Sequence, residues 1–165
     1  MASFKFSGLD EYTARLKRLA DPKEYSQYIG KAVYVGAGII ADAVRANIQS
    51  IPTTRSSAPG TPENPIDGIA PAQKAGLLNG FGISQMQDSN GYYNVKIGFE
   101  GYNTIRTAKY PNGQPNAVIA RSVESGTSFR KKHPFVAPAV KAAKERAEQM
   151  ISVTLDAAIN ELMED

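Results

Sequence analysis

The stretch Pro138–Met163, PAVKAAKERAEQMISVTLDAAINELM, is the most regular part of this chain of 165 residues. Its apolar residues return every three or four positions, and that period indicates an amphipathic helix. The repeating residues are Ala139, Ala143, Ala147, Met150, Ile151, Leu155, Ala158, Ile159 and Leu162. Pro138 suits the first turn of a helix, where its missing N–H is not needed. We therefore predict a C-terminal helix over 138–163, on the order of 40 Å long and longer than one small core requires.

Two more helices are predicted toward the N-terminus. Apolar residues recur at helical spacing from Leu9 to Leu19, and Asp21-Pro22 interrupts this pattern. The pattern resumes over 23–50, with Gly36 and Gly38 in its middle. A glycine inside a helix costs about 1 kcal/mol relative to alanine. We therefore expect these small residues to let another element pack closely against the helix.

The segment 51–75 differs in kind from its neighbours. It has no hydrophobic period and is rich in Ser, Thr and Gly, and it contains the five prolines Pro52, Pro59, Pro62, Pro65 and Pro71. This composition predicts a long exposed loop. Loops of more than about 12–15 residues are uncommon in compact domains and are usually functional or disordered. Two interpretations stay open, a binding loop that orders only in a complex and a flexible insertion.

A β-hairpin is predicted after this loop. Residues 78–87 alternate loosely between polar and apolar, residues 93–99 alternate cleanly, and Asn90-Gly91 between them is a strong turn signal. The period of residues 117–124 does not decide between strand and helix. The fold class that follows is α+β, with a small antiparallel β-sheet packed by long N-terminal and C-terminal helices. We predict a single domain over 1–165.

Composition excludes several kinds of chemistry. The chain has no cysteine and a single histidine, His133. A disulfide framework, a thiol nucleophile and a cysteine or multi-histidine metal site are therefore excluded. No apolar run approaches the roughly 20 residues of a membrane span. We expect no cofactor, no metal and no membrane partner.

One stretch imitates a dinucleotide-binding motif. Residues 33–41, VYVGAGIIA, match an apolar strand followed by G-x-G-x-x-A. That motif requires a strand, a tight glycine turn and then a helix, with an acid about twenty residues on. Here the glycines lie in a helical pattern and no acid stands near 55–57. His133 follows a run of Lys and Arg and is interpreted as a solvated loop residue. We therefore predict no enzymatic activity.

Positive charge gathers in the middle of the chain. The whole chain has 19 basic and 16 acidic residues, but 51–135 carries nine basic against five acidic, and 136–165 three against six. The densest run is Arg130-Lys131-Lys132, with Phe129 and Phe135 on its flanks. This is less than a dedicated DNA-binding domain shows. A small nucleic-acid-binding protein that uses the basic region 96–133 is therefore the alternative function.

Two motifs near the C-terminus resemble a known family. They are Val123-Glu124-Ser125-Gly126-Thr127-Ser128 and Pro134-Phe135-Val136-Ala137-Pro138-Ala139, followed by the long helix. Together they are similar to the C-terminal signature of the minor-tail or tail-completion proteins of long-tailed bacteriophages and prophages. Gly8-Leu9-Asp10-Glu11 and Ala75–Gly80 are similar to two earlier stretches of the family. This chain departs from the family in Ala75, in Ser125 and in its longer Pro-rich loop.

The resemblance implies an α+β virion structural protein that completes or terminates the tail at its head-proximal end and takes part in head–tail joining. It implies protein–protein contacts within an oligomeric ring of sister subunits, and with the major tail protein and the head–tail connector proteins. It also implies a location in the host cytoplasm during assembly and in the virion afterwards.

The candidate contact residues follow from the two motifs and the basic run. Contacts to partners are expected from the loop 51–75 and the segment 100–134. The partner-contact candidates are Glu124, Ser125, Gly126, Thr127, Phe129, Pro134, Phe135 and Pro138. Phe135 and Pro138 have an alternative role, which is to fix the last helix to the core. Arg130, Lys131 and Lys132 are the candidate contacts to DNA passing through a lumen.

Overall fold

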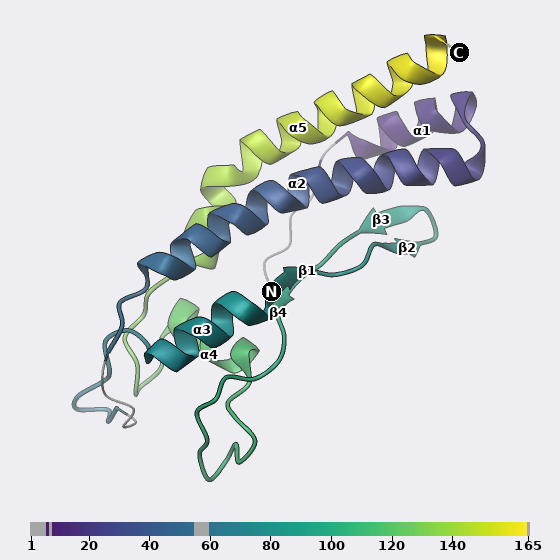
Figure 1. The fold of residues 1–165 in the computed structure, drawn as a ribbon. Coiled ribbons are helices and arrows are strands. Elements are labelled where there is room, and N and C mark those ends of the chain that lie inside the picture. Colours follow the sequence, from purple (N-terminus) through teal and green to yellow (C-terminus); the bar gives the residue numbers. More distant parts are fainter. Residues whose placement is uncertain (1–5, 7, 55–59, 165) are drawn as a thin grey trace.

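Three helices lie side by side and form an elongated bundle (Figure 1). They are α1 (Leu9–Leu19), α2 (Pro22–Ser50) and α5 (Val136–Glu164). The structure is a computed structural model that describes residues 6, 8–54 and 60–164. The helices predicted over 9–19, 23–50 and 138–163 are thus confirmed to within two residues at each end. None of the helices in these described ranges combines the length and the apolarity that a membrane span requires.

The two long helices α2 and α5 run antiparallel and pack closely along their length (Figure 1). Near the chain termini, α1 covers this pair around Leu16, Ile29 and Leu155, which are fully buried. At Gly36 the helices meet so closely that a Cβ there would lie 2.5 Å from Cδ1 of Ile151. A Cβ at Gly38 would have no neighbour within 4 Å. The predicted small-residue packing is therefore confirmed at Gly36 and is wrong at Gly38.

The other half of the molecule packs short elements against the opposite end of the α2–α5 pair (Figure 1). It contains α3 (Pro71–Gly80) and α4 (Asn116–Ser125). The hairpin region contains β1 (Phe81–Ile83), β2 (Gln87–Ser89), β3 (Tyr92–Asn94) and β4 (Ile97–Phe99). Of these elements, α3, α4, β1 and β4 form a second core with α2 and α5 around Val44, Leu77 and Phe135, whereas Tyr93 of β3 packs against the first core. The α+β class is confirmed.

The sheet is smaller and more divided than the sequence predicts. β1 pairs with β4 and β2 with β3, both antiparallel, in two separate two-stranded sheets. Asn90 and Gly91 form the turn with φ values of 57° and 87°, as a two-residue hairpin turn of left-handed residues requires. The strand predicted over 93–99 is interrupted between β3 and β4. The opposite side of the hairpin is interrupted too, between β1 and β2, where the Tyr34 hydroxyl of α2 donates to Ser84 O at 3.2 Å and accepts from Met86 N at 2.7 Å.

Two segments take a different form from their predictions. Residues 78–80, expected in a strand, end α3, which begins at Pro71. Gln73 stabilises this helix start by accepting a hydrogen bond from Ala70 N at 3.1 Å. The undecided residues 117–124 belong to α4. Both helices have a proline at or just before their first residue, where the φ of proline suits a helix start.

The Pro-rich segment is not an exposed loop throughout. Ile51, Ile69 and Ala70 are buried, and Ile69 N donates to Pro52 O at 2.9 Å. Gly68 has a φ of 86° and a Cβ on it would lie 2.1 Å from Pro52 O, so glycine is required there. The prediction for 51–75 is therefore wrong at both ends, while its part 55–59 lies outside the described residues. The chain folds back on itself here because buried backbone groups must find partners.

Candidate functional site

The two motifs that carry the family resemblance meet at the start of α5. Glu124, in the last turn of α4, accepts hydrogen bonds from the backbone N–H groups of Phe135, Val136 and Ala137 at 2.7, 2.9 and 3.0 Å. The first N–H groups of a helix have no partner within the helix. The next residue, Pro138, has no N–H. The Glu124 carboxylate therefore binds three of the N–H groups that have no partner within α5, and at the fourth position Pro138 has no N–H that needs a partner.

The electrostatics of this cap favour an ionised carboxylate. Burial raises the pKa of the Glu124 carboxyl, but the three backbone hydrogen bonds and the charge of Lys132 outweigh burial and place that pKa below its usual value. Glu124 also lies at the positive end of the helix dipole, which stabilises an anion. The Glu124 side chain therefore has a structural role, as the cap of α5.

A tight turn follows α4 and presents an apolar side chain. Gly126 has a φ of 71° and ends the helix. Thr127 and Arg130 then exchange backbone hydrogen bonds of 2.9 and 3.3 Å across the turn. Phe129, inside this turn, keeps 52% of its surface exposed. The turn is held on its far side, because Phe129 O accepts from Ile66 N at 3.0 Å and Ile66 O accepts from Lys131 N at 2.9 Å.

Arg130 connects this turn to the Pro-rich segment from the inside. Only 8% of Arg130 is exposed. Its guanidinium donates to Gly68 O and, at 3.4 Å, to Oε1 of Gln73, whose own amide donates to Gln114 at 2.7 Å. Burial lowers the pKa of the Arg130 guanidinium. The prediction that Arg130 contacts DNA is wrong, because its donors face protein carbonyls and not solvent.

A second, exposed connection lies beside it. Asp67 of the Pro-rich segment accepts from His133 Nε2 at 2.5 Å and from Lys131 Nζ at 3.3 Å. The hydrogen bond from His133, followed by the one from Lys131, lowers the pKa of Asp67. His133 is partly exposed and its backbone N–H donates to Val123 O at 2.8 Å. The interpretation of His133 as a merely solvated residue is therefore wrong.

The predicted contact residues divide into core and surface groups. Phe135 is 2% exposed and makes an edge contact with the ring of Phe99. Its predicted role as a partner contact is therefore wrong, and its alternative role in fixing the last helix is the one observed. Glu124 and Gly126 serve the helix ends. Exposed at the surface are Ser125, Thr127, Phe129, Pro134, Pro138, Lys131 and Lys132.

Sequence reasoning missed three residues of this site. Asp67, Gly68 and Gln73 lie in or next to the Pro-rich segment, far along the chain from the residues that they bind. Pro71 followed by Gln73 was an available signal of a helix start, since Pro is favoured at the first helical position and Gln at the third. Nothing local indicated the contacts of Asp67 and Gly68 with residues more than sixty positions away.

The structure also decides the dinucleotide hypothesis. All nine residues of 33–41 lie inside α2. The strand and the glycine turn that would place a helix N-terminus against a pyrophosphate are therefore absent from this stretch. Within the described ranges, no group of three or more His, Asp or Glu side chains is placed to hold a metal ion.

Comparisons with models of known protein families, with curated proteins and with solved structures find no match to this chain. A proposal about function therefore depends on the resemblance of the two motifs and on the surface that they form.

The surface that the two C-terminal motifs form is apolar around Phe129. A hollow of about 260 Å³ separates the turn from α4 and from the segment 105–114. Val118, 44% exposed, and the partly exposed Ile105 and Tyr110 line it together with Phe129. Exposed apolar side chains that gather in one place indicate a surface for another protein.

Proposed function

We propose that this chain is a structural protein of a bacteriophage or prophage particle. It completes or terminates the tail at the head-proximal end and takes part in head–tail joining through protein–protein contacts. The resemblance of the two C-terminal motifs supports this proposal. The observation that carries it is the rigid presentation of Phe129 at an apolar hollow by those same motifs.

The physical argument concerns the cost of ordering a contact surface. A contact residue on a mobile loop loses conformational entropy when a partner binds. Backbone hydrogen bonds fix the turn of Phe129 on both sides, and the buried Arg130 fixes its base. An aromatic side chain held in this way is typical of the residues that dominate binding energy at protein interfaces. We therefore place a contact with a sister subunit or a tail protein at this hollow.

Ring formation follows from one contact of this kind. When a surface of one copy binds a different surface of the next copy, repetition of the contact closes a ring if the rotation allows it. The exposed outer sides of α2 and α5 along the elongated bundle are available as the second surface (Figure 1). We propose that the free chain closes into a ring only when the tail or the connector is present.

The test uses particles and the gene that encodes the chain. Particles are purified from a host that carries the gene, and mass spectrometry measures whether the chain is present at several copies per particle. A stop codon in the gene should give particles whose heads and tails remain separate or whose tails have irregular length. Complementation with the wild-type gene should restore joined particles. Absence of the chain from purified particles would refute the proposal.

The nucleic-acid-binding alternative has less support. Of the basic run, Arg130 is buried and Lys131 bonds to Asp67, so Lys132 is the exposed cation of that run without an ion pair among the described residues. Each phosphate contact adds to the salt dependence of binding. A salt titration of the purified chain with duplex DNA separates this alternative from the structural role.

A further inference from the structure

Charges of opposite sign gather at the two ends of the molecule (Figure 1). The segment 101–123, which forms the loop before α4 and most of α4 itself, has three basic residues and no acidic residue. The segment 147–164, the C-terminal part of α5, has four acidic residues and no basic residue. Both segments also expose apolar side chains, and charge of one sign around apolar side chains is a feature of surfaces that bind an oppositely charged partner.

The positive charges lie around the hollow beside Phe129. Its three neighbouring cations are Arg106, Lys109 and Arg121, all of them exposed. Arg121 follows the lining residue Val118 by about one helical turn, and Lys109 Nζ lies 5.5 Å from the ring centre of Tyr110, another lining residue. In the part of the chain that the structure describes, no acidic residue lines the hollow, and none of the three cations forms an ion pair. We call the hollow and these three cations the basic surface.

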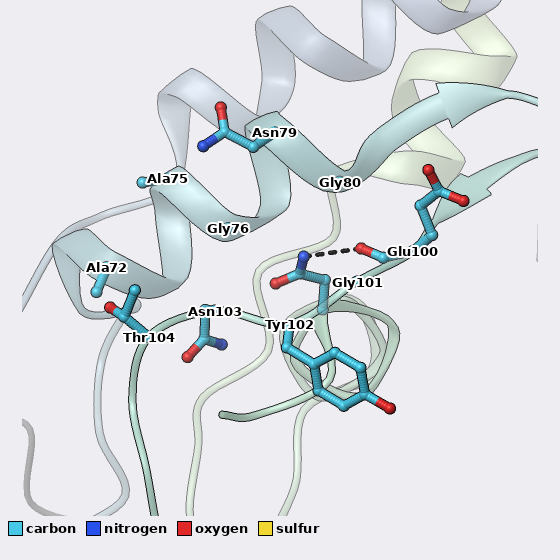
Figure 2. A pocket seen from close by; sticks show the side chains of 11 residues that line it. Ala72, Ala75, Gly76, Asn79, Gly80, Glu100, Gly101, Tyr102, Asn103 and Thr104 are labelled. Carbon is cyan, nitrogen blue, oxygen red and sulfur yellow. Dashed lines mark hydrogen bonds between the residues drawn. The ribbon is translucent and has the colours of Figure 1, made fainter. Parts of the chain in front are cut away.

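Hydrogen bonds hold the loop of the basic surface in place. At the base of the loop, Asn116 Nδ2 donates to Glu100 O at 2.8 Å, the bond drawn in Figure 2. Further along, Thr107 N donates to Tyr110 O at 3.1 Å and Tyr110 N donates to Thr107 O at 3.0 Å. A partner that binds this surface therefore does not have to order its backbone, which removes one cost of binding.

The C-terminal part of α5 has an apolar stripe on its outer side. Met150, Val153 and Ala157 are exposed, and Val153 keeps 51% of its surface exposed. Their spacing of three and four residues places them on one side of the helix, away from Ile151 and Leu155, which are buried in the core. Apolar residues at such positions are the anchors by which a helix binds in a groove of another protein.

The negative charges of this segment lie beside the stripe. Glu148 forms an ion pair with Lys144 at 3.8 Å, whereas Asp156, Glu161 and Glu164 are exposed and form no ion pair with any described residue. Glu161 and Glu164 follow the stripe toward the helix end, about one and two turns beyond it. We call the stripe and these three unpaired acids the acidic surface.

We propose that the acidic surface of one copy of this chain binds the basic surface of a second copy. The apolar stripe of α5 enters the hollow beside Phe129, and the acids of α5 lie against the three cations around it. The charge of each surface matches the other, and this complementarity selects a second copy as the occupant. The inference rests on the proposed function, which takes the hollow as a contact surface, and it adds that the partner is a sister subunit.

The positions of the two surfaces determine the kind of assembly. Because they lie at opposite ends of the molecule, a chain cannot bind its own acidic surface, and each copy keeps one surface of each kind free for further copies (Figure 1). The contact is therefore heterologous, and its repetition closes a ring if the rotation between neighbours allows it.

The experiment uses cross-linking between single cysteines, since the chain has no cysteine of its own. Val118→Cys places a thiol at the hollow, and Val153→Cys places one on the stripe of α5. The two purified proteins are mixed with a short bis-maleimide reagent, which does not require the strict geometry of a disulfide. Peptide mapping then identifies which cysteines are joined. The product that joins 118 to 153 should form about tenfold faster than either symmetric product, because the docked contact holds these two thiols together.

A matched control uses another exposed position of the same helix. Ala142→Cys lies about 16 Å from position 153 along α5, in its basic part. Mixed with the Val118→Cys protein, it should react only at the rate of random collision. The reagent also traps short-lived contacts, so the test does not require the free chain to form a stable ring.

Charge exchange between the two surfaces is the second measurement. Arg106→Glu with Arg121→Glu reverses the basic surface of one protein, and Glu161→Lys with Glu164→Lys reverses the acidic surface of the other. Each pair of substitutions alone should slow the 118–153 cross-link about tenfold, because like charges then face one another. When both reversed proteins are mixed, the original rate should return. All four positions are exposed, and circular dichroism checks that the variants are folded.

The outcome is distinguishable from the outcome for the proposed function, because the purified proteins test the contact without any particle. A dominant 153–153 product would identify a symmetric contact between two α5 helices and would overturn the inference. It would also be overturned by a 118–153 rate no higher than the control or by a rate that charge reversal leaves unchanged. Cross-linking with rescue by a chain that is absent from purified particles would support the contact and refute only the role in a phage particle.

Discussion

Glu124 Oε2 lies 2.7 Å from the backbone nitrogen of Phe135, and this hydrogen bond joins the end of α4 to the start of α5. The same carboxylate also accepts from Val136 and Ala137, and Pro138 lacks the next N–H. The spacing of Pro134-Phe135-x-x-Pro138 after Glu124 thus has a physical reason. It forms a complete helix cap from residues outside the helix, in addition to any contact that the motif makes with partners.

The first prediction concerns this cap. Glu124→Gln removes the negative charge and replaces one acceptor oxygen by a donor, which leaves backbone N–H groups of α5 without a partner. We expect a loss of about 2–3 kcal/mol in the free energy of unfolding at pH 7, measured by urea denaturation. Glu145→Gln, on an exposed face of α5, is the matched control and should change stability by less than about 0.5 kcal/mol.

The pH dependence of this difference follows from the lowered pKa of Glu124. A carboxyl whose pKa is lower in the folded state stabilises the fold above its unfolded pKa, and that contribution is lost as pH falls through the folded value. The difference between wild type and Glu124→Gln should therefore be full at pH 7 and shrink below the usual range for glutamate. A difference that stays constant down to pH 2 would contradict the assigned role.

The second prediction separates Arg130 from its neighbours in the basic run. Arg130→Met leaves Gly68 O without this donor and removes one of the two donors to Gln73 Oε1, which keeps Ala70 N, so we expect a loss of about 2–3 kcal/mol in stability. The Pro-rich segment should also become sensitive to limited proteolysis near 60–69. Lys132→Met, on the exposed side of the same run, should leave the proteolysis unchanged and change stability by less than about 0.5 kcal/mol, because its charge is the smallest of the causes that act on the pKa of Glu124. Equal effects of the two substitutions would show that the buried contacts of Arg130 contribute neither to the stability of the protein nor to the protection of the Pro-rich segment from proteolysis.

The third prediction compares two glycines of α2. The Cβ that Gly38→Ala adds would have no neighbour within 4 Å. Because alanine has the higher helix propensity, this substitution should raise the free energy of unfolding by about 1 kcal/mol. Gly36→Ala puts a Cβ 2.5 Å from Cδ1 of Ile151 and should be destabilised by about 1–2 kcal/mol because the helices must separate. In an Ile151→Ala background, which lacks both that Cδ1 and the Cγ1 that would lie 2.6 Å away, the cost of Gly36→Ala should fall. Thermal denaturation compares the wild type, the three single variants and the double variant, and an equal gain at both glycines would contradict the close packing.

The accuracy of the sequence-based predictions depended on how local each interaction is. The helices around Leu16 and Leu155 and the turn at Asn90-Gly91 follow from periods and turn preferences within a few residues, and these predictions are confirmed. The position of Arg130 depends on Gly68, 62 residues away, and no local pattern encodes that distance. A run of basic residues usually faces solvent, so its one buried member could not be identified before the fold was known.

The fourth prediction tests contact with DNA in particles and in solution. Lys132→Glu reverses an exposed charge of the basic run, so a lumen lined by this run should retain or pass DNA less well, measured as infectivity and as packaged DNA per particle. In solution, a salt titration of the purified chain with duplex DNA should show little binding, because Arg130 of the basic run is buried and Lys131 pairs with Asp67. Steep loss of tight binding with added salt would instead favour the nucleic-acid alternative. Normal infectivity of the Lys132→Glu particles would remove the lumen hypothesis.

The fifth prediction contrasts the two phenylalanines on either side of the basic run. Phe135→Ala removes a fully buried ring and should cost about 3–5 kcal/mol in stability, so any assembly defect would follow from unfolding. Phe129→Ser removes a half-exposed ring from the apolar hollow and should change stability by less than about 0.5 kcal/mol. If Phe129 contacts a sister subunit or a tail protein, this variant should stay folded but fail to join the assembly. Native mass spectrometry of the chain, alone and with the tail protein encoded beside it, measures this directly. Assembly of the Phe129→Ser protein at the wild-type level would show that the contact surface lies elsewhere on the chain.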